Sequence, residues 1–453
     1  MSIPLNARKK RTLKTMIPVQ EIKNEEIIMA NVVKWLALSL IAGALTGGLI
    51  AGFLLALRAS IRFVAALPDW RYALIPAGLL GSVYSIRLIA PAAAGHGTDK
   101  VISALHYRAG RIPFLVVPAK ILSTILTLAP GGVVGTEGPS VQIGAGFTSA
   151  LAVWLKFSEK ERKKLVICGI SAALSAVLGA PVGGAVFGVE VLFVGGFFYP
   201  VLLPAVISSI ASYCVCAAMG VSYAVPAVAV PALSAASLGW CACAAAFFSL
   251  VCIYHVETVR FISRAFQKIN APLPVKSLIS ASVLLCVAAA GGDFLLGMGE
   301  DGLTGALAGI EQPWYAFFMK SVLLAVTLAG GGSGGVLTPT FYIGAAAGGL
   351  FAGAFGLDVG FFAALGFVAC VAGAVNTPLA ATFMAVELFG SAIAPYAGMA
   401  CVICYMLTGL RSLYPTQILV QPKSDEFVLV DPDDKTSWKV RLRKKSRRKF
   451  SSR

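Results

Sequence analysis

Charged residues are scarce in this chain. Lys, Arg, Asp and Glu together make up 13% of the 453 residues, and there are only three histidines. A typical soluble domain carries about 25% charged residues. Hydrophobic residues reach 58%, and the mean hydropathy is +0.83. This composition excludes an ordinary water-soluble domain.

Long stretches without charge run through most of the chain. About 20 apolar residues are needed to cross a bilayer as a helix, and several of these runs are too short or too rich in glycine to do so alone. Backbone that breaks at membrane depth must be satisfied inside a bundle. The sequence therefore predicts an all-α polytopic membrane protein with broken and re-entrant helices. The apolar runs are 31–57, 72–90, 113–130, 165–194, 199–220, 232–255, 276–297, 314–330, 338–373 and 378–410.

Cysteine is present, but without the companions that metal or redox sites need. All ten cysteines lie in or beside apolar segments, and pairs such as Cys214/Cys216 and Cys401/Cys404 have no histidine or carboxylate close by in sequence. Buried cysteines of this kind act as small packing residues. We therefore predict no metal site and no cofactor.

The formal net charge of +16 arises largely from the two ends of the chain. Basic segments at 1–30 and 421–453 flank the apolar region 31–420, and Lys and Arg mark the cytoplasmic side of membrane proteins. We expect a multi-pass protein of the cytoplasmic membrane with both termini in the cytoplasm and some contact with anionic lipid. No nucleic-acid-binding motif that interleaves aromatic residues with these charges is found, so no nucleic-acid partner is expected. The basic residues are Arg8, Lys9, Lys10, Arg11, Lys14, Arg441, Arg443, Lys444, Lys445, Arg447, Arg448 and Lys449.

Two glycine-rich segments, GGVVGTEGPSVQIGAG at 131–146 and GGGSGGVLTPTFYIGAAAGG at 330–349, indicate an internal repeat. Pro139 and Pro339 lie 200 positions apart, and each segment precedes a second break followed by an apolar stretch with one glutamate. Matching broken helices in two halves are typical of inverted-repeat transporters, whose helix N-termini converge near the midplane. We predict repeats of about 31–220 and 232–420. Helix N-termini favour negative charge, so the expected cargo is an anion.

Glu137 is the most informative ionisable residue in the apolar regions. It lies in GTEGP, between glycines and just before a helix-compatible run. A carboxylate there can occupy an anion site itself, so it would block the path when ionised and yield when protonated or displaced. The alternative is a structural carboxylate that caps a buried helix. The second half has no acid at the equivalent position, which is Leu337.

From about residue 30 to residue 420 the chain resembles the ClC-type chloride channels and chloride/proton antiporters. GTEGP at 135–139 is similar to the family's GxEGP segment with its gating glutamate, and GGVLTP at 334–339 is similar to its GxFxP segment. Tyr414 in RSLYPTQIL matches the tyrosine that contacts the central anion, and Lys120 in VPAKIL matches a buried lysine. The matched pathway residues are Gly135, Gly138, Pro139, Gly334, Gly335 and Pro339.

The resemblance implies transport of chloride or a similar small anion through a pathway gated by Glu137, either coupled to protons or uncoupled from them. It also implies a homodimer with one pathway in each subunit, and backbone amides of Val336 and Leu337 among the anion ligands. Such a protein is not an enzyme. The segment after Pro415 is too short for the paired regulatory domains of some relatives.

The first departure from the family pattern is GHGTDKV at 95–101, where GSGIP is usual. His96 takes the place of an anion-coordinating serine, followed by Gly97, and an imidazole can donate a hydrogen bond to an anion. Alternatively, His96 turns away and the loop amides bind the anion. Fluoride or nitrate selectivity stays open for this reason. His106 and His255 flank charged segments and are expected to face water.

The second departure is the pair Glu190-Val191, where antiporters usually carry a proton-relaying second acid. Counting from Pro181 places Val191 at that acid. Valine carries no proton, so either protons reach Glu137 by another route, or the protein is an uncoupled channel or uniporter. A slip of one residue would instead place Glu190 on the proton route. Glu387, its counterpart, aligns with a structural acid, and Glu190 has the same simple explanation.

An intramembrane acyltransferase or hydrolase is the alternative of another class. His96 and Asp99 loosely resemble an HxxxD pattern, and Ser333 formally satisfies GxSxG. Both signals are weak, because GxSxG arises trivially in a glycine run and lacks a strand-turn-helix setting. The repeat has no explanation under this hypothesis.

Overall fold

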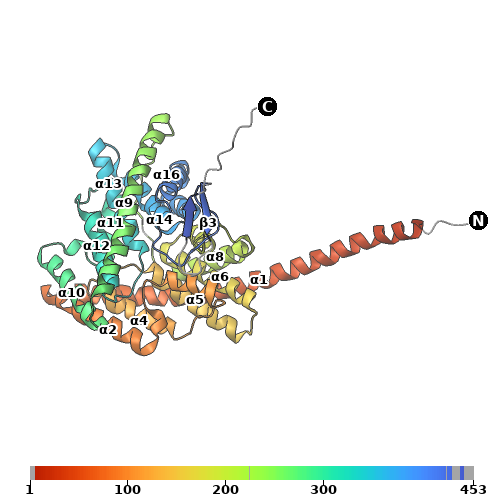
Figure 1. The fold of residues 1–453 in the computed structure, drawn as a ribbon, viewed down its shortest axis with the longest axis horizontal. Coiled ribbons are helices and arrows are strands. Elements are labelled where there is room, and N and C mark those ends of the chain that lie inside the picture. Colours follow the sequence, from red (N-terminus) through yellow and green to blue (C-terminus); the bar gives the residue numbers. More distant parts are fainter. Residues whose placement is uncertain (1–5, 224, 425, 431–438, 443–453) are drawn as a thin grey trace, which may run out of the picture.

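The chain folds into a bundle of helices in a computed structural model that describes residues 6–223, 225–424, 426–430 and 439–442 (Figure 1). Most of the basic tail predicted at 421–453 lies outside these residues. Four described helical stretches are long and apolar enough to cross a membrane: Ile28–Ala65, Trp70–Ile89, Tyr199–Ala218 and Ala235–Lys268. The other apolar helices are shorter, as the broken runs in the sequence predict.

The helices follow one another in the same order in each half of the chain. In the first half they are α1 (Asn6–Ala65), α2 (Leu74–Ile89), α3 (Thr98–Tyr107), α4 (Val116–Leu128), α5 (Glu137–Trp154), α6 (Glu159–Leu178), α7 (Pro181–Glu190) and α8 (Leu202–Ala218). In the second they are α9 (Ala235–Lys268), α10 (Leu273–Ala289), α11 (Glu300–Leu307), α12 (Ala316–Ala329), α13 (Leu337–Phe355), α14 (Val359–Val375), α15 (Pro378–Phe389) and α16 (Ala394–Leu407). Short 3-10 turns are η1 (Asp69–Ala73), η2 (Pro91–Ala93), η3 (Tyr199–Val201), η4 (Asp293–Leu295) and η5 (Ser391–Ile393).

Two small β ladders depart from a purely helical chain. Strand β1 (Phe193–Val194), after α7, pairs in parallel with β2 (Ile418–Leu419), and β3 (Phe427–Val430) pairs antiparallel with β4 (Lys439–Leu442). The β1–β2 pair ties the end of the first half to the segment after the last helix. The all-α membrane fold is otherwise confirmed.

The first helix begins well before residue 31, the predicted start of the membrane domain. Helix α1 is continuous from Asn6 to Ala65 and projects well beyond the bundle at its N-terminal end (Figure 1). From Asn6 onward, the predicted basic segment 1–30 is therefore helical and continuous with the first candidate span. Only its portion from Ile28 onward qualifies as a candidate span.

Helix pairs pack closely where glycines face each other. A Cβ on Gly144 of α5 would lie 2.5 Å from the carbonyl oxygen of Gly169 on α6, so a larger residue there would clash. Gly344 of α13 and Gly366 of α14 approach each other in the same way in the second half. Small residues let helix backbones approach closely in membranes. The same crossing therefore forms twice.

The second break in each half has an evident local cause. Helix α6 ends before Gly179 and α14 before Asn376, both in the left-handed region with φ of 68° and 58°. Pro181 and Pro378 then occupy the first turn of α7 and α15, where a missing N–H costs nothing.

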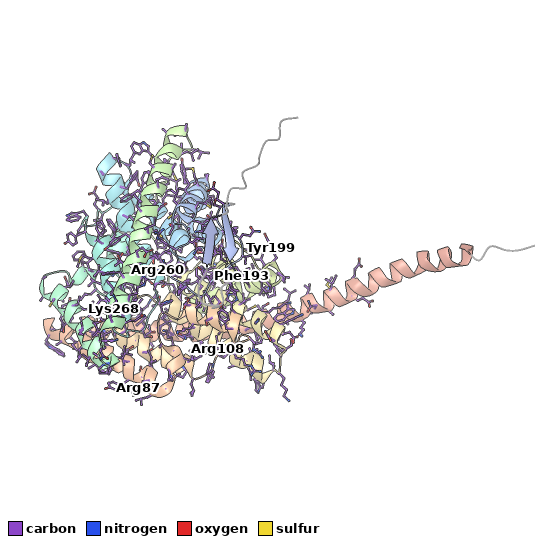
Figure 2. The ribbon with its side chains drawn as sticks, viewed as in Figure 1. Arg87, Arg108, Phe193, Tyr199, Arg260 and Lys268 are labelled. Carbon is purple, nitrogen blue, oxygen red and sulfur yellow. The ribbon has the colours of Figure 1, made fainter. Side chains whose placement is uncertain are left out.

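Buried charges contrast with those on the periphery. Arg87, Arg108 and Lys268 lie on the outside of the helical body (Figure 2). Lys120 and Lys320, on the corresponding helices α4 and α12, are both 0% exposed. Buried charges of this kind need internal partners, and each marks a place where structure or function depends on it.

Candidate functional site

The two glycine-rich segments meet at the centre of the fold. The amide of Gly135 donates to the carbonyl oxygen of Gly335 at 2.8 Å, and the amide of Gly335 donates back to Gly135 at 2.6 Å. Such reciprocal contacts are what a twofold relation between two halves produces. Helices α5 and α13 begin just after these bonds, at Glu137 and Leu337, so their N-terminal turns lie side by side.

Glycine is required at this meeting point because backbones approach too closely for a side chain. A Cβ on Gly138 would lie 2.9 Å from Cα of Gly335 and would overlap the carbonyl oxygen of His96. Gly97 has a φ of 91° and packs against the Gly138 carbonyl group. Three segments, 95–98, 135–139 and 334–338, therefore converge here.

The carboxylate of Glu137 reaches across to the other half. Glu137 is 3% exposed, and its Oε2 accepts a hydrogen bond from the Thr338 amide at 3.1 Å. The Thr338 hydroxyl also lies 2.6 Å from both carboxylate oxygens and donates to them. The negative group thus sits in the first turn of α13, where helix N–H groups favour negative charge. The sequence did not single out Thr338, since only the fold brings it to Glu137.

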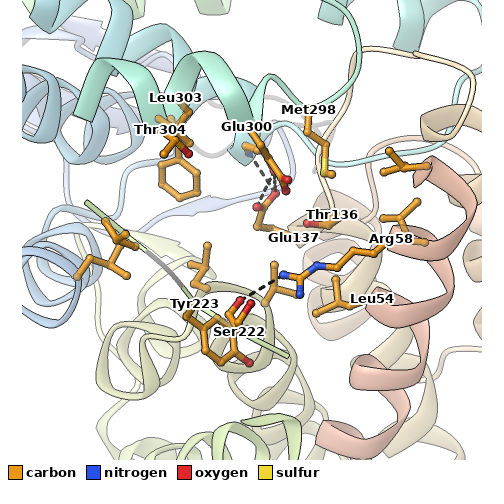
Figure 3. Close-up of a pocket in the computed structure, with 18 of the residues that line it drawn as sticks. Leu54, Arg58, Thr136, Glu137, Ser222, Tyr223, Met298, Glu300, Leu303 and Thr304 are labelled. Carbon is orange, nitrogen blue, oxygen red and sulfur yellow. Dashed lines mark hydrogen bonds between the residues drawn. The ribbon is translucent and has the colours of Figure 1, made fainter. Parts of the chain in front are cut away.

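A cavity of about 730 Å³ leads to Glu137 from one side of the bundle (Figure 3). We call it the vestibule. Arg58 of α1 and Glu300 of α11 line it together with Glu137 and Thr338. Arg58 donates to the Ser222 carbonyl oxygen at 3.3 Å, which holds its guanidinium group at the wall. The vestibule therefore gives access to the carboxylate past the charged side chains of Arg58 and Glu300, in an otherwise largely apolar lining.

His96 and Tyr414 lie together at the convergence of the loops. Their ring centroids are 5.6 Å apart and their planes are inclined by 31°. Tyr414 is 0% exposed, and in the described part of the chain neither its hydroxyl nor His96 Nδ1 has a hydrogen-bond partner. Unpartnered buried polar atoms are unusual in native proteins. His96 and Tyr414, the two side chains predicted to bind the anion, therefore lie together, and each has a polar atom without a hydrogen-bond partner among the described residues.

Lys120 supports the His96 loop from behind. Its ammonium donates to the carbonyl oxygens of Ala93 at 3.1 Å and Gly95 at 2.5 Å. Lys320 donates in the same way to Leu295 at 2.8 Å and to Gly297 at 3.0 Å in the second half. Both lysines hold the loop that precedes α3 or α11, and Lys120 adds positive charge beside the segment 95–98.

Each of Glu190 and Glu387 caps the start of the helix that carries the other: Glu190 of α7 caps α15, and Glu387 of α15 caps α7. The Glu190 carboxylate accepts from the amides of Leu379 at 3.0 Å and Ala380 at 2.8 Å, at the start of α15. The Glu387 carboxylate accepts from Val182 at 2.8 Å and Gly183 at 2.7 Å, at the start of α7. Four otherwise unsatisfied helix amides are paired in this way. The Glu190 carboxylate therefore has helix amides of α15 as its partners.

Val191, at the position where antiporters usually carry a proton-relaying acid, is a buried apolar residue. Its carbonyl oxygen accepts from Nε2 of Gln417 at 2.9 Å, and the same amide nitrogen donates to the Val375 carbonyl oxygen at 2.7 Å. Ser412 donates to Gln417 Oε1 at 2.7 Å, and its own hydroxyl accepts from the Tyr414 amide at 2.9 Å. Gln417 thus anchors the Tyr414 loop on α7 and α14.

The expectation that His255 faces water is wrong. His255 is 1% exposed, with Nδ1 at 3.1 Å from the Ser321 hydroxyl and Nε2 at 3.2 Å from the Thr340 hydroxyl. It lies inside α9, whose helix continues beyond the apolar run to Lys268, so the flanking charges do not mark a loop. His106 is half-buried, with Nε2 at 3.0 Å from the Leu192 carbonyl oxygen.

Ser333 has surroundings that differ from those of a nucleophile. It is 0% exposed, its hydroxyl accepts from Ser123 at 2.9 Å, and its amide donates to Thr127 at 2.9 Å. Thr124 lies 3.3 Å from the same hydroxyl. Among the described contacts of Ser333 no imidazole or carboxylate appears, although an activated serine needs an adjacent base. Ser333 instead links the two halves.

Comparisons with known proteins agree on one family. A family model described as voltage gated chloride channel matches residues 77–409. The chain is 31% identical over 401 residues to the chloride/fluoride channel protein of Pseudomonas syringae pv. tomato, covering 86% of this chain and 87% of that protein. A solved CLC-type fluoride/proton antiporter has a TM-score of 0.80 at 24% identity, covering 85% of this chain and 98% of its own. A slow cyanobacterial Cl⁻/H⁺ antiporter has a TM-score of 0.72 at 17% identity, covering 83% and 94%.

Proposed function

Because the chain belongs to the voltage-gated chloride channel family, we propose that it moves a small halide, chloride or fluoride, across a membrane in exchange for protons, with Glu137 as the gate. The relatives named above are a chloride/fluoride channel protein and antiporters that couple fluoride or chloride to protons. Both ions fit the anion that the paired helix N-termini favour.

The position of the Glu137 carboxylate carries this proposal. It occupies the first turn of α13, where it accepts hydrogen bonds from the amide and hydroxyl of Thr338. An incoming anion needs the same kind of donors, so carboxylate and anion compete for one place. Protonation removes the negative charge and weakens the carboxylate's hold. Anion entry and proton uptake are thereby linked at one side chain.

The proposed pathway runs from the vestibule past Glu137 to Tyr414. Arg58 attracts the anion into the vestibule. Beyond Glu137, the amides of Val336 and Leu337 and the polar atoms of His96 and Tyr414 bind it. The glycines and prolines of the two matched motifs keep the backbone close enough for this. They are Gly135, Gly138, Pro139, Gly334, Gly335 and Pro339, and Gly97 acts in the same way in the segment 95–98.

Uncoupled anion flow is the second candidate, and one observation favours it. Val191 is buried where an antiporter of this family is expected to carry a proton-relaying acid, and Glu190 is engaged with the start of α15. Protons would then need a route to Glu137 that uses water or other side chains. Simultaneous recording of anion and proton movement separates the two candidates.

The proposed setting is the cytoplasmic membrane, with the domain 31–420 embedded and both termini in the cytoplasm. Two copies would assemble, each with its own pathway, and the basic ends would contact anionic lipid. Cysteine-specific labelling of single-cysteine variants at residues 20 and 445 in inverted and right-side-out vesicles tests the orientation. Labelling from the periplasmic side would contradict it.

Ion efflux from liposomes tests the proposed function. Purified protein is reconstituted into vesicles loaded with potassium chloride or potassium fluoride, and valinomycin is added to start electrogenic efflux. We expect anion release well above that of protein-free vesicles. A parallel set of vesicles loaded with potassium nitrate tests whether nitrate is also transported. Release equal to protein-free vesicles for all three anions would refute the function.

A further inference from the structure

We propose that the hydroxyl group of Thr98 is a direct ligand of the transported anion. This inference rests on the proposed function and adds a residue to its binding site. Thr98 is the first residue of α3, two positions after His96, and is 0% exposed. In the described part of the chain its hydroxyl has no hydrogen-bond partner. A buried hydroxyl without a partner is costly unless a ligand fills the gap.

Thr98 is one of three such groups around a single place. His96 Nδ1, Thr98 Oγ1 and the Tyr414 hydroxyl are all buried and unpartnered within the described residues. The rings of His96 and Tyr414 lie 5.6 Å apart, and Thr98 follows His96 and Gly97 on the same loop, at the start of α3. Each of these groups can donate a hydrogen bond. A small anion accepts several hydrogen bonds at once and would satisfy all three.

A second contact fixes Thr98 relative to Tyr414. The next residue, Asp99, accepts from the Thr416 amide at 3.0 Å, and the Thr416 hydroxyl donates to Asp99 Oδ1 at 2.6 Å and to its carbonyl oxygen at 2.9 Å. These bonds clamp the start of α3 to the loop that carries Tyr414. The clamp consumes the donors of Thr416, whereas the hydroxyls of Thr98 and Tyr414 have no hydrogen-bond partner among the described residues.

Charge around the cluster also suits an anion. Lys120 holds the Gly95 carbonyl oxygen directly behind the loop, so a positive group lies beside the three donors. Helix α3 begins at Thr98, and its N-terminal end adds partial positive charge. The Asp99 carboxylate next in sequence is engaged by two hydrogen bonds from Thr416. Thr98 therefore supplies a hydroxyl group in place of the serine hydroxyl that is lost with histidine at position 96.

Equilibrium anion binding to purified protein in detergent tests this role without relying on transport. Isothermal titration with sodium fluoride and sodium chloride is run on the wild type and on Thr98→Val, which keeps the shape and removes the hydroxyl. We expect dissociation constants about tenfold higher for Thr98→Val, since hydrogen bonds to a charged group are lost. Thr98→Ser keeps the hydroxyl and should bind within about twofold of the wild type.

The outcomes are distinguishable. Equal binding by the wild type, Thr98→Val and Thr98→Ala would overturn the role of the hydroxyl and leave the proposed function intact. Equal weakening by Thr98→Ser and Thr98→Val would make the position a packing site and also overturn it. Absence of binding and of efflux in the wild type would refute the proposed function, and this inference with it. Size-exclusion profiles and thermal unfolding of each variant verify that it is folded.

Discussion

The hydroxyl of Thr338 lies 2.6 Å from the carboxylate of Glu137, and the two residues come from opposite halves of the chain. One half thus supplies the acid, and the other supplies the donors that hold it. Leu337 occupies the position in the second half that is equivalent to Glu137. The repeat is therefore symmetric in its backbone but has a carboxylate in one half only. A single carboxylate can therefore govern one shared site between two helix N-termini.

Removing the Thr338 hydroxyl should loosen the gate. Thr338→Val takes away a donor that stabilises the ionised carboxylate by about 1.5 to 3 kcal/mol. Anions should then compete more successfully, and half-maximal efflux should occur at an anion concentration about tenfold lower. The neutral carboxyl is favoured in the variant, so the pH dependence of efflux should move to higher pH.

Thr338→Ser provides the matched control, because it keeps the hydroxyl and should behave like the wild type. Efflux is measured over a series of internal anion concentrations and pH values. An unchanged pH profile in Thr338→Val would show that this contact does not hold the gate.

The exchange of caps between Glu190 and Glu387 should matter for stability more than for proton movement. Each alanine substitution leaves two helix amides unsatisfied, at a cost of about 1 to 3 kcal/mol. Glu190 is 6% exposed whereas Glu387 is half-buried, so Glu190→Ala should lower the melting temperature more.

Thermal unfolding in detergent, monitored by tryptophan fluorescence, compares the melting temperatures of Glu190→Ala and Glu387→Ala. Glu190→Gln keeps one acceptor oxygen and should retain the wild-type ratio of protons to anions. A selective loss of proton movement in Glu190→Gln would place this residue on the proton route after all.

A methyl group at Gly138 should disrupt the site. Gly138→Ala would press against the His96 carbonyl oxygen and Cα of Gly335, so the three converging segments would have to separate. We expect efflux to fall at least about tenfold, because misplacing reacting or binding groups by an ångström is expensive.

Gly52→Ala is the control for this substitution. Gly52 lies inside α1, and an added Cβ there meets no atom within 4 Å. Alanine is the better helix former, so the control should be as stable as the wild type or more so. Normal efflux by Gly138→Ala would mean that the convergence is not tight in the working protein.

Arg58 should raise the rate of anion entry through its charge. Arg58→Gln removes a positive group from the vestibule, and the resulting loss of flux should be large at about 10 mM salt and small at about 300 mM, since salt screens such fields. Arg87→Gln, which alters a peripheral charge, should have no salt-dependent effect. Efflux at two ionic strengths with matched anion gradients measures the difference. A loss independent of salt would point to a structural role.

The sequence predicts the repeat and the place of Glu137 because both depend on local chemistry. Glycines, the prolines at the two breaks and the isolated acids are visible at fixed spacing without any knowledge of contacts. In the structure, the backbone bridge between Gly135 and Gly335 joins the two segments that this spacing marks. The fold class and the family follow from the same features.

What the sequence does not reveal are partners that only the tertiary fold brings together. Nothing in the sequence distinguishes Thr338 and Thr98 from other threonines. Thr338 matters because it binds the Glu137 carboxylate, 201 positions away. Thr98 matters because its buried hydroxyl has no hydrogen-bond partner among the described residues. The charges that follow His255 predict a water-facing boundary there, but α9 runs on past those charges and leaves His255 buried. Long-range packing decides such cases.

The most direct test records anion and proton movement together in the same liposomes for the wild type and Glu137→Gln. Under an imposed chloride or fluoride gradient, the wild type should release anion and drive protons against their gradient. Glu137→Gln, which mimics the protonated gate, should still release anion but move no protons and show no pH dependence. Unchanged proton movement or an unchanged pH response in Glu137→Gln would contradict the role of Glu137 as the gate.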